Sequence, residues 1–226
     1  SIMDGRDRSC GAVAAVRTVR HPISLARLVM TGTSHVLLAA DGAEAFADTT
    51  DVERVDNTWF DTESRRRALE RALQKRSNPD DNAPKGTVGC VVLDANGNLA
   101  AATSTGGMTA KRFGRVGDSP IVGAGTMGGN ATSAVSGTGT GEEYIRHAIA
   151  HDVHARMAYS GWTLQRAADH VIHNVLKPDD GGLIAVGADG SIALPFNTAG
   201  MFRGAADSRG RFEVGIWEEM KPAARR

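Results

Sequence analysis

A glycine followed by a threonine opens an apolar segment in the middle of the chain, where residues 85–90 read KGTVGC. A threonine hydroxyl is a weak nucleophile until a base removes its proton. If the chain is cut between Gly86 and Thr87, the freed α-amino group of Thr87, with a reference pKa of about 7.7–8.0, can be that base. Gly86 would assist the cut because a residue without Cβ tolerates strained backbone. Taken alone, the pair also fits an ordinary loop end and strand start.

Two further threonines end the segment that we expect to lie beside Thr87. The sequence ANGN at residues 95–98 predicts a hairpin turn between strands at residues 87–94 and 99–105. Side chains alternate along a strand, so Thr103 and Thr105 share one face. The hairpin would bring them close to Thr87, although such a pair is also typical of a solvated strand surface.

A glycine-rich turn, GRVGDSP at residues 114–120, places two opposite charges close together. The guanidinium of Arg115 suits a carboxylate, which it can bind through two parallel hydrogen bonds, and the carboxylate of Asp118 suits an ammonium group. The spacing therefore fits a zwitterionic ligand. The alternative is a local ion pair that stabilises a loop.

A second glycine-rich segment, SGTGTGEE at residues 136–143, leads directly into an expected helix. Backbone N–H groups at such a helix start, exposed by Gly137, Gly139 and Gly141, can bind a phosphate or a tetrahedral oxyanion. No phosphate-loop lysine follows, and no GxGxxG motif with an acidic partner is present, which argues against a nucleotide. A simple turn and helix cap remains the alternative.

Histidines recur at metal-compatible spacing on the helix that we expect at residues 142–157. His147, His151 and His154 lie at positions i, i+4 and i+7. They flank arginine and aspartate residues, so we interpret them as part of a polar face and expect no metal site. His170 and His173 are interpreted in the same way.

Helical and strand patterns are mixed along the chain, and hairpins dominate its second half. Such a mixture argues for the α+β class, with antiparallel sheet covered by helices, rather than a doubly wound parallel sheet. Residues 77–85, SNPDDNAPK, are expected to form a surface linker that is open to cleavage. The expected elements are strands at residues 10–16 and 35–40, helices at residues 21–30, 42–48, 62–76 and from Thr163 to before Pro178, and a hairpin at residues 182–196.

The composition limits the classes of partner. The 226 residues include 26 basic and 26 acidic side chains, so nothing indicates a nucleic-acid or membrane surface. No apolar run approaches the roughly 20 residues of a membrane span. Cys10 and Cys90 both adjoin apolar runs, and we expect two buried thiols rather than a disulfide. From these features we expect a cytoplasmic protein.

Three long segments together resemble one family. They are GTVGCVVLDANGNLAAATSTGGMTAKRFGRVGDSPIVGAG, SGTGTGEEYIRHAIAHD and GGLIAVGADGSIALPFNTAGMFRG. They resemble the isoaspartyl peptidase/plant-type L-asparaginases, which are N-terminal nucleophile hydrolases, and a looser similarity extends to residues 3–30. The resemblance implies an αββα four-layer sandwich that is made as a precursor and cut before Thr87. Residues 1–86 would form the α-subunit region and residues 87–226 the β-subunit region of one domain, assembled as a homodimer of cleaved units.

The resemblance also implies roles for individual residues. Thr87 matches the nucleophile of the family, and Thr105 matches the threonine that assists it. Arg115 and Asp118 match the residues that hold the α-carboxylate and the α-amine of the substrate. Thr138 and Gly139 match the oxyanion-hole residues, and Gly141 matches a nearby glycine that contacts the substrate. Self-cleavage would fall between Gly86 and Thr87. The implied reaction is hydrolysis of L-asparagine and of β-aspartyl dipeptides without a cofactor. The order of preference between these substrates stays open.

Some features limit the resemblance. Glycosylasparaginases share GRVGDSP but typically have aspartate before the nucleophile, so Gly86 and the TGTGE segment favour the isoaspartyl peptidase branch. Family members have a first strand and a sodium-binding loop before the segment that matches MDG here, so we expect this chain to lack that strand and the structural sodium ion. Two alternatives remain, which are a glycosylasparaginase-like hydrolase and a non-enzymatic module that binds an anion at residues 136–143.

Overall fold

The first half of the chain and the hairpin that starts at Thr87 share one five-stranded sheet. The structure is a computed structural model that describes residues 1–74 and 86–222. The strand order is β3-β2-β1-β5-β4, and only β2 and β3 pair in parallel. The strands are β1 (Ile2–Asp4), β2 (Cys10–Ala14), β3 (Leu37–Ala39), β4 (Thr87–Leu93) and β5 (Leu99–Thr105).

Two further sheets are entirely antiparallel, with orders β6-β7-β8-β9 and β10-β11-β12. Their strands are β6 (Thr126–Gly128), β7 (Ser133–Gly139), β8 (Gly181–Gly187), β9 (Ile192–Ala193), β10 (Arg203–Ala206), β11 (Phe212–Gly215) and β12 (Lys221–Pro222). Both expected hairpins form, and Gly97 and Gly190 adopt the positive φ angles of +81° and +80° that their turns require. The prediction of antiparallel sheet is confirmed.

The β4–β5 hairpin packs closely against β7 of the second sheet. A Cβ atom on Gly89 would overlap the side chain of Ser136, so glycine at this position permits the close approach. Small and branched side chains fill the space between the sheets, including Leu99, Ala101 and Ala134. This packing fixes the position of the β4–β5 hairpin relative to β7.

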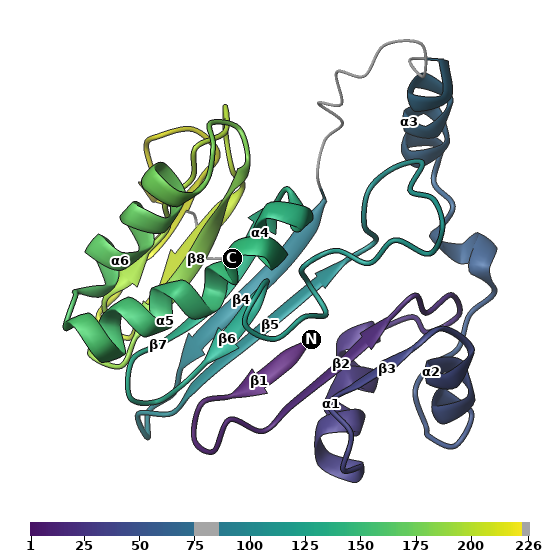
Figure 1. Ribbon diagram of the computed structural model, residues 1–226, viewed down its shortest axis with the longest axis horizontal. Helices are drawn as coiled ribbons and strands as arrows, with labels where there is room; N and C mark the ends of the chain where they lie inside the picture. Colours follow the sequence, from purple (N-terminus) through teal and green to yellow (C-terminus); the bar gives the residue numbers. More distant parts are fainter. Residues whose placement is uncertain (75–85, 223–226) are drawn as a thin grey trace.

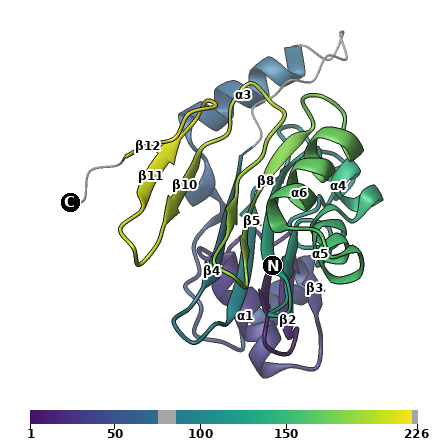
Figure 2. The same ribbon diagram turned by 90° about the vertical axis from the view of Figure 1, so that its left-hand side faces the viewer.

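Helices pack on both of the larger sheets. Helix α1 (Pro22–Gly32) buries Leu25 and Val29 against β2. Helices α5 (Ile149–Ser160) and α6 (Leu164–His170) lie beside β7 and β8, away from α1 (Figure 1). Figure 2 shows α5 and α6 on one side of the strands and the β10–β12 sheet projecting on the other. This mixture of helices and antiparallel sheet belongs to the α+β class.

The expected helix at residues 142–157 is two helices, so that prediction is wrong in one respect. Helix α4 (Gly141–His147) ends at Ala148, which has a left-handed backbone with φ +48°, and α5 follows. The break turns the apolar stripe. Tyr144 is therefore fully buried, whereas Ile145, which we expected in the apolar face, is 37% exposed.

The remaining helices are α2 (Ala40–Ala47), α3 (Glu63–Gln74), a 3₁₀ turn (Asn57–Phe60) and a π-helical turn (Val171–Val175). Thr163 caps α6 as predicted, accepting a hydrogen bond from the backbone N–H of Arg166 at 3.4 Å. Helix α3 buries none of its residues, and Figure 1 shows it apart from the sheets. The expected linker at residues 77–85 lies outside the described residues. No helix within residues 1–74 or 86–222 is long and apolar enough to cross a membrane.

The expectation of two buried thiols is wrong. Cys10 is half-buried and Cys90 is exposed, and both are free. The cause is the alternation of β4, which places Cys90 on the same face as Val88 and Val92. That face is open, because Val88 is 68% and Val92 48% exposed.

Candidate active site

The hydroxyl groups of two strand-end threonines meet in front of the backbone at Gly86. Thr87 and Thr105 are directly paired across the β4–β5 hairpin. The Thr87 hydroxyl donates to Oγ1 of Thr105 at 3.2 Å, and the Thr105 hydroxyl donates to the carbonyl oxygen of Gly86 at 2.9 Å. The backbone N–H of Gly107 completes the arrangement by donating to Thr105 at 3.1 Å. A potential nucleophile, a hydroxyl partner and a polarised carbonyl therefore share one strand end.

Thr103 shares the face of Thr105, but it is not a solvated surface residue. It is 1% exposed, and its hydroxyl lies 2.7 Å from that of Ser136 on β7. Thr126 on β6 donates to the same Thr103 hydroxyl at 2.6 Å. These contacts tie β5 to the second sheet two residues before Thr105, which restrains the strand end that carries the hydroxyl pair.

A cavity of about 240 Å³ brings Thr87 together with the residues of the second glycine-rich segment. Ser136, Gly137 and Thr138 line it. The buried Tyr144 hydroxyl holds this segment from behind, donating to the carbonyl oxygens of Thr138 at 3.0 Å and Gly182 at 2.7 Å. The end of β7 is thus fixed opposite Thr87.

The two glycines that flank Thr138 are needed for the position of the Tyr144 ring. A Cβ atom would lie 2.5 Å from the ring at Gly137 and 2.7 Å from it at Gly139. Real Cβ atoms do not approach other atoms so closely, so a larger residue at either position would displace the ring or the strand. The backbone N–H groups around Thr138 could donate to an oxyanion only while the Tyr144 ring stays packed against the two glycines.

A larger cavity of about 460 Å³ is bordered by Thr105 and Arg115. The guanidinium of Arg115 makes two parallel bonds with Glu142 on α4, at 2.9 Å for Nε–Oε1 and 2.8 Å for Nη2–Oε2. Arg115 is therefore not simply the partner of Asp118 in a loop-stabilising ion pair. Its planar fork is already arranged to bind a carboxylate.

Asp118 is the buried charge of the site. Its side chain is 6% exposed, and Oδ2 has no hydrogen-bond partner among the described residues. Burial raises the pKa of Asp118 to about 6, although the charge of Arg115 acts in the opposite direction. A Cβ atom on Gly141 would lie 2.7 Å from Nη2 of Arg115 and 3.0 Å from Oδ1 of Asp118. Glycine at position 141 is thus what lets a helix start approach both charged groups.

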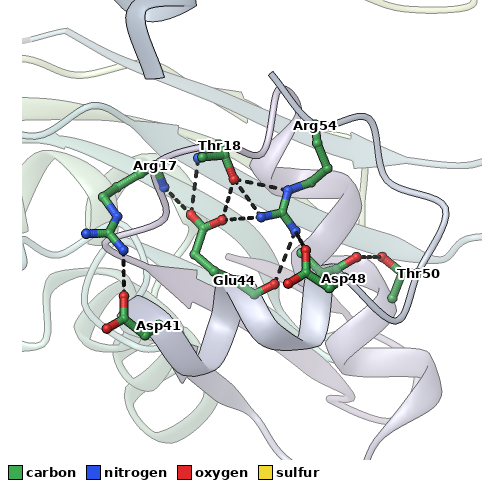
Figure 3. A network of polar contacts seen from close by, with 8 residues as sticks. Arg17, Thr18, Asp41, Glu44, Asp48, Thr50 and Arg54 are labelled. Atoms are coloured by element: carbon green, nitrogen blue, oxygen red, sulfur yellow. Dashed lines mark hydrogen bonds and ion pairs between the residues drawn. The ribbon is translucent and has the colours of Figure 1, made fainter. Parts of the chain in front are cut away.

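The loop that forms the far side of the larger cavity is held by a carboxylate from α2. Glu44 accepts from the backbone N–H groups of Arg17 and Thr18, from the Thr18 hydroxyl, and from the guanidinium of Arg54 at 2.6 Å (Figure 3). Burial alone would raise the pKa of Glu44, but these hydrogen bonds hold it below its usual value. Arg17 also borders the cavity, so the network in Figure 3 fixes part of the cavity's lining.

The histidines of α4 and α5 do not share a polar face, which corrects that interpretation. His154 is 1% exposed, its Nδ1 contacts the Thr132 hydroxyl, and its Nε2 lies 3.0 Å from Arg8. His151 is exposed beside it. No group of three or more potential metal-binding side chains occurs in the described ranges.

The residues singled out from the sequence fall into two adjacent groups. Thr87 and Thr138 line the smaller cavity, and Thr105 and Arg115 line the larger one. The contact between the Thr87 and Thr105 hydroxyls joins the two groups. Gly139 follows Thr138 and packs against the ring of Tyr144, while Asp118 and Gly141 converge with Arg115.

Comparison with known families identifies the source of these motifs. A family model described as Asparaginase matches residues 1–216. This chain belongs to the asparaginase family. It is 48% identical to an isoaspartyl peptidase of Salmonella typhimurium, over 96% of this chain and 73% of the relative. It is 45% identical to a probable isoaspartyl peptidase/L-asparaginase 2 of Arabidopsis thaliana, over 96% and 75%, and 45% identical to an isoaspartyl peptidase of Escherichia coli, over 96% and 71%.

Reasoning from the sequence missed some features of this asparaginase-family site. Tyr144 was not singled out, although the glycines at positions 137 and 139 signal that something bulky packs on that strand. Ser136 begins the second glycine-rich segment, and nothing in that segment indicates its contact with Thr103. Glu142 was not linked to Arg115, because nothing local indicates contact between residues 27 positions apart.

Proposed function

We propose that this chain is a self-cleaving amidohydrolase that converts L-asparagine to L-aspartate and ammonia and hydrolyses β-aspartyl dipeptides. Its relatives are named isoaspartyl peptidases and L-asparaginases, and the family match spans nearly the whole chain. The observation that carries the proposal is the contact of the Thr87 and Thr105 hydroxyls beside the Gly86 carbonyl. Chain cleavage requires all three groups, and amide hydrolysis would use the two hydroxyls again.

Chain cleavage would begin with attack of the Thr87 hydroxyl oxygen on the Gly86 carbonyl carbon. The Thr105 hydroxyl, which donates to that carbonyl oxygen, would stabilise the negative charge that develops there. The peptide C–N bond then breaks, the proton passes to the Thr87 nitrogen, and an ester joins Gly86 to Thr87. Water hydrolyses the ester and leaves Thr87 with a free α-amine.

In the cleaved enzyme, the α-amine of Thr87 would take the proton from its own hydroxyl. The oxygen attacks the side-chain amide carbonyl of the substrate, and Thr138 and Gly139 support the oxyanion, a contribution of about 2.7–4 kcal/mol per donor. Ammonia or an amine leaves with the proton, and water hydrolyses the β-aspartyl ester. No cofactor participates in these steps.

The charged groups of the site would select the substrate. Arg115 would bind the α-carboxylate and Asp118 the α-ammonium group of the aspartyl part. The unpartnered Oδ2 of Asp118 supports this assignment, because an ammonium group would supply the missing donor. Glu142 would give up or share its two bonds to Arg115 when substrate binds.

The same proposal includes the architecture of the mature protein. The packed sheets with α1 on one side and α5 and α6 on the other support an αββα sandwich. Residues 1–86 and 87–226 would stay together as one domain after cleavage, and two cleaved units would form a homodimer.

Incubation of the purified chain tests the proposal. We expect mass spectrometry to find two fragments separated between Gly86 and Thr87, and ammonia to be released from asparagine after cleavage. Thr87→Ala should remain one chain, and Thr87→Ser should be cut more slowly. A Thr87→Ala protein that matures without added protease would refute the mechanism, and an uncut parent that binds anions would favour the binding module.

A further inference from the structure

The larger cavity has a basic lining. Four basic side chains line it, and none of the described residues in its lining is acidic. Three of the four are paired with a carboxylate: Arg17 with Asp41, Arg20 with Glu53, and Arg115 with Glu142. The fourth is Lys111.

Lys111 has no carboxylate of the described residues within 4 Å. Its ammonium group instead donates to the carbonyl oxygen of Gly106 at 2.9 Å and lies 2.8 Å from where a Cβ of Gly107 would be. These two glycines directly follow Thr105, whose hydroxyl contacts that of Thr87. A cation without an anionic partner among the described residues thus lines the same cavity as Thr105, whose hydroxyl contacts that of Thr87.

The electrostatics favour an anion at this position. Partial burial, and then the positive charge of Arg115, lower the pKa of Lys111. A bound carboxylate would offset both effects. Arg115 places a second positive charge on the lining of the same cavity. A ligand with two carboxylates therefore fits this cavity better than a ligand with one.

We propose that Lys111 binds the carboxylate of the leaving amino acid in β-aspartyl peptides, and so sets the preference for these peptides over asparagine. The inference rests on the proposed function. In a β-aspartyl dipeptide the leaving nitrogen carries a Cα whose carboxylate is the next group, close to the scissile bond. Asparagine releases ammonia and has no such carboxylate. Arg115 and Lys111 would bind the two carboxylates of the dipeptide, one on each side of the reacting amide.

Three substrates separate this role from a structural one: asparagine, β-Asp-Leu, and β-Asp-leucinamide, in which the second carboxylate is a neutral amide. We expect Lys111→Gln to lower kcat/KM for β-Asp-Leu by roughly 10- to 100-fold, the loss of one charge-assisted contact. Asparagine and β-Asp-leucinamide should change by less than about threefold. Lys111→Arg should restore most of the activity on β-Asp-Leu. The matched control is Lys177→Gln, an exposed lysine that does not line the cavity.

Each variant is first checked by mass spectrometry for cleavage before Thr87, and rates are expressed per cleaved chain. Equal loss on all three substrates would show that Lys111 only supports the loop, and would overturn the inference while leaving the hydrolase intact. A parent that cleaves β-Asp-Leu and β-Asp-leucinamide equally well would overturn it too. A parent inactive on asparagine and on β-Asp-Leu would instead refute the proposed function, and this inference with it.

Discussion

Replacement of Asp118 by asparagine should make the protein more stable at neutral pH while impairing substrate binding. Burial raises the pKa of Asp118 from 3.8 to about 6. The difference of roughly 2 pKa units corresponds to about 3 kcal/mol by which ionised Asp118 destabilises the folded state. Asparagine keeps the shape and an acceptor oxygen but carries no charge. The variant should therefore avoid this cost.

The sign and the pH window follow from the raised pKa. Below about pH 4 Asp118 is protonated in both folded and unfolded protein, so the variant has no advantage. Between pH 4 and 6 the unfolded parent ionises first, and the parent loses stability relative to the variant as the pH rises. Above pH 6 the difference is constant at its upper limit of about 3 kcal/mol, or roughly 6–12 °C in Tm for a chain of this size.

Thermal unfolding of parent and Asp118→Asn at half-unit steps from pH 4 to 8 measures this difference. Asp189→Asn is the control of opposite sign, because hydrogen bonds from Ser191 lower the pKa of Asp189, and its loss should not stabilise the protein at neutral pH. A difference in Tm for Asp118→Asn that is absent, negative, or independent of pH would refute the reasoning. Aspartate, the expected product, should raise the Tm of the parent more than that of the variant.

Three further substitutions test other contacts. Tyr144→Phe removes the hydroxyl that donates to the carbonyl oxygens of Thr138 and Gly182, so it should cost about 0.5–1.5 kcal/mol in the free energy of unfolding and lower kcat, as denaturant titration and steady-state rates would show. Glu44→Gln should destabilise the protein at pH 7, because the lowered pKa of Glu44 means that its ionised carboxylate stabilises the folded state. The destabilisation should become smaller as the pH falls below about 4.5 and the carboxylate is protonated, which unfolding measured at several pH values would show. Arg115→Lys should lower kcat/KM for asparagine by roughly 10-fold or more, since lysine cannot form two parallel bonds, with a smaller effect on cleavage before Thr87.

The central contact of the site could be predicted because it depends on local geometry. The hairpin loop is closed by the Asp94 N–H, which donates to the carbonyl oxygen of Asn98 at 2.9 Å, so the loop is centred on Asn96; Thr87 and Thr105 each lie nine residues from Asn96 (96 − 87 and 105 − 96). Positions equally distant from a tight turn pair across the strands. The Asn-Gly motif therefore predicts the hairpin and brings the two threonines near each other, whereas their direct pairing depends on the three-residue loop at residues 95–97.

Contacts between distant segments could not be predicted in this way. The pairing of Arg115 with Glu142 and the burial of Asp118 depend on how α4 meets the GRVGDSP turn. The end of α4 is set by the left-handed backbone at Ala148, a residue whose type gives no sign of it. An alanine with positive φ is uncommon, so helical periodicity reasonably predicted one continuous helix.

The open face of β4 shows a different limit. Val88, Cys90 and Val92 have the composition of a buried strand face, yet all three are exposed in the described structure. Apolar composition indicates that a strand can be covered, but it does not specify which other segment covers it. For the same reason the sequence did not distinguish the exposed Cys90 from a core thiol.

The role proposed for Thr105 links chain cleavage to substrate hydrolysis. In the uncut chain its hydroxyl donates to the carbonyl oxygen of Gly86 and accepts from Thr87. Cleavage turns Gly86 into a free chain end, and its departure would leave the Thr105 hydroxyl without that acceptor, beside a nucleophile whose amine has just been freed. An incoming side-chain amide presents the same kind of carbonyl to the same two hydroxyls. Self-cleavage would thus hydrolyse the Gly86–Thr87 peptide bond, which is the first amide held against the two hydroxyls. The side-chain amide of a substrate would then take the place of the Gly86 carbonyl, with its α-carboxylate bound by Arg115 and its α-ammonium group by Asp118.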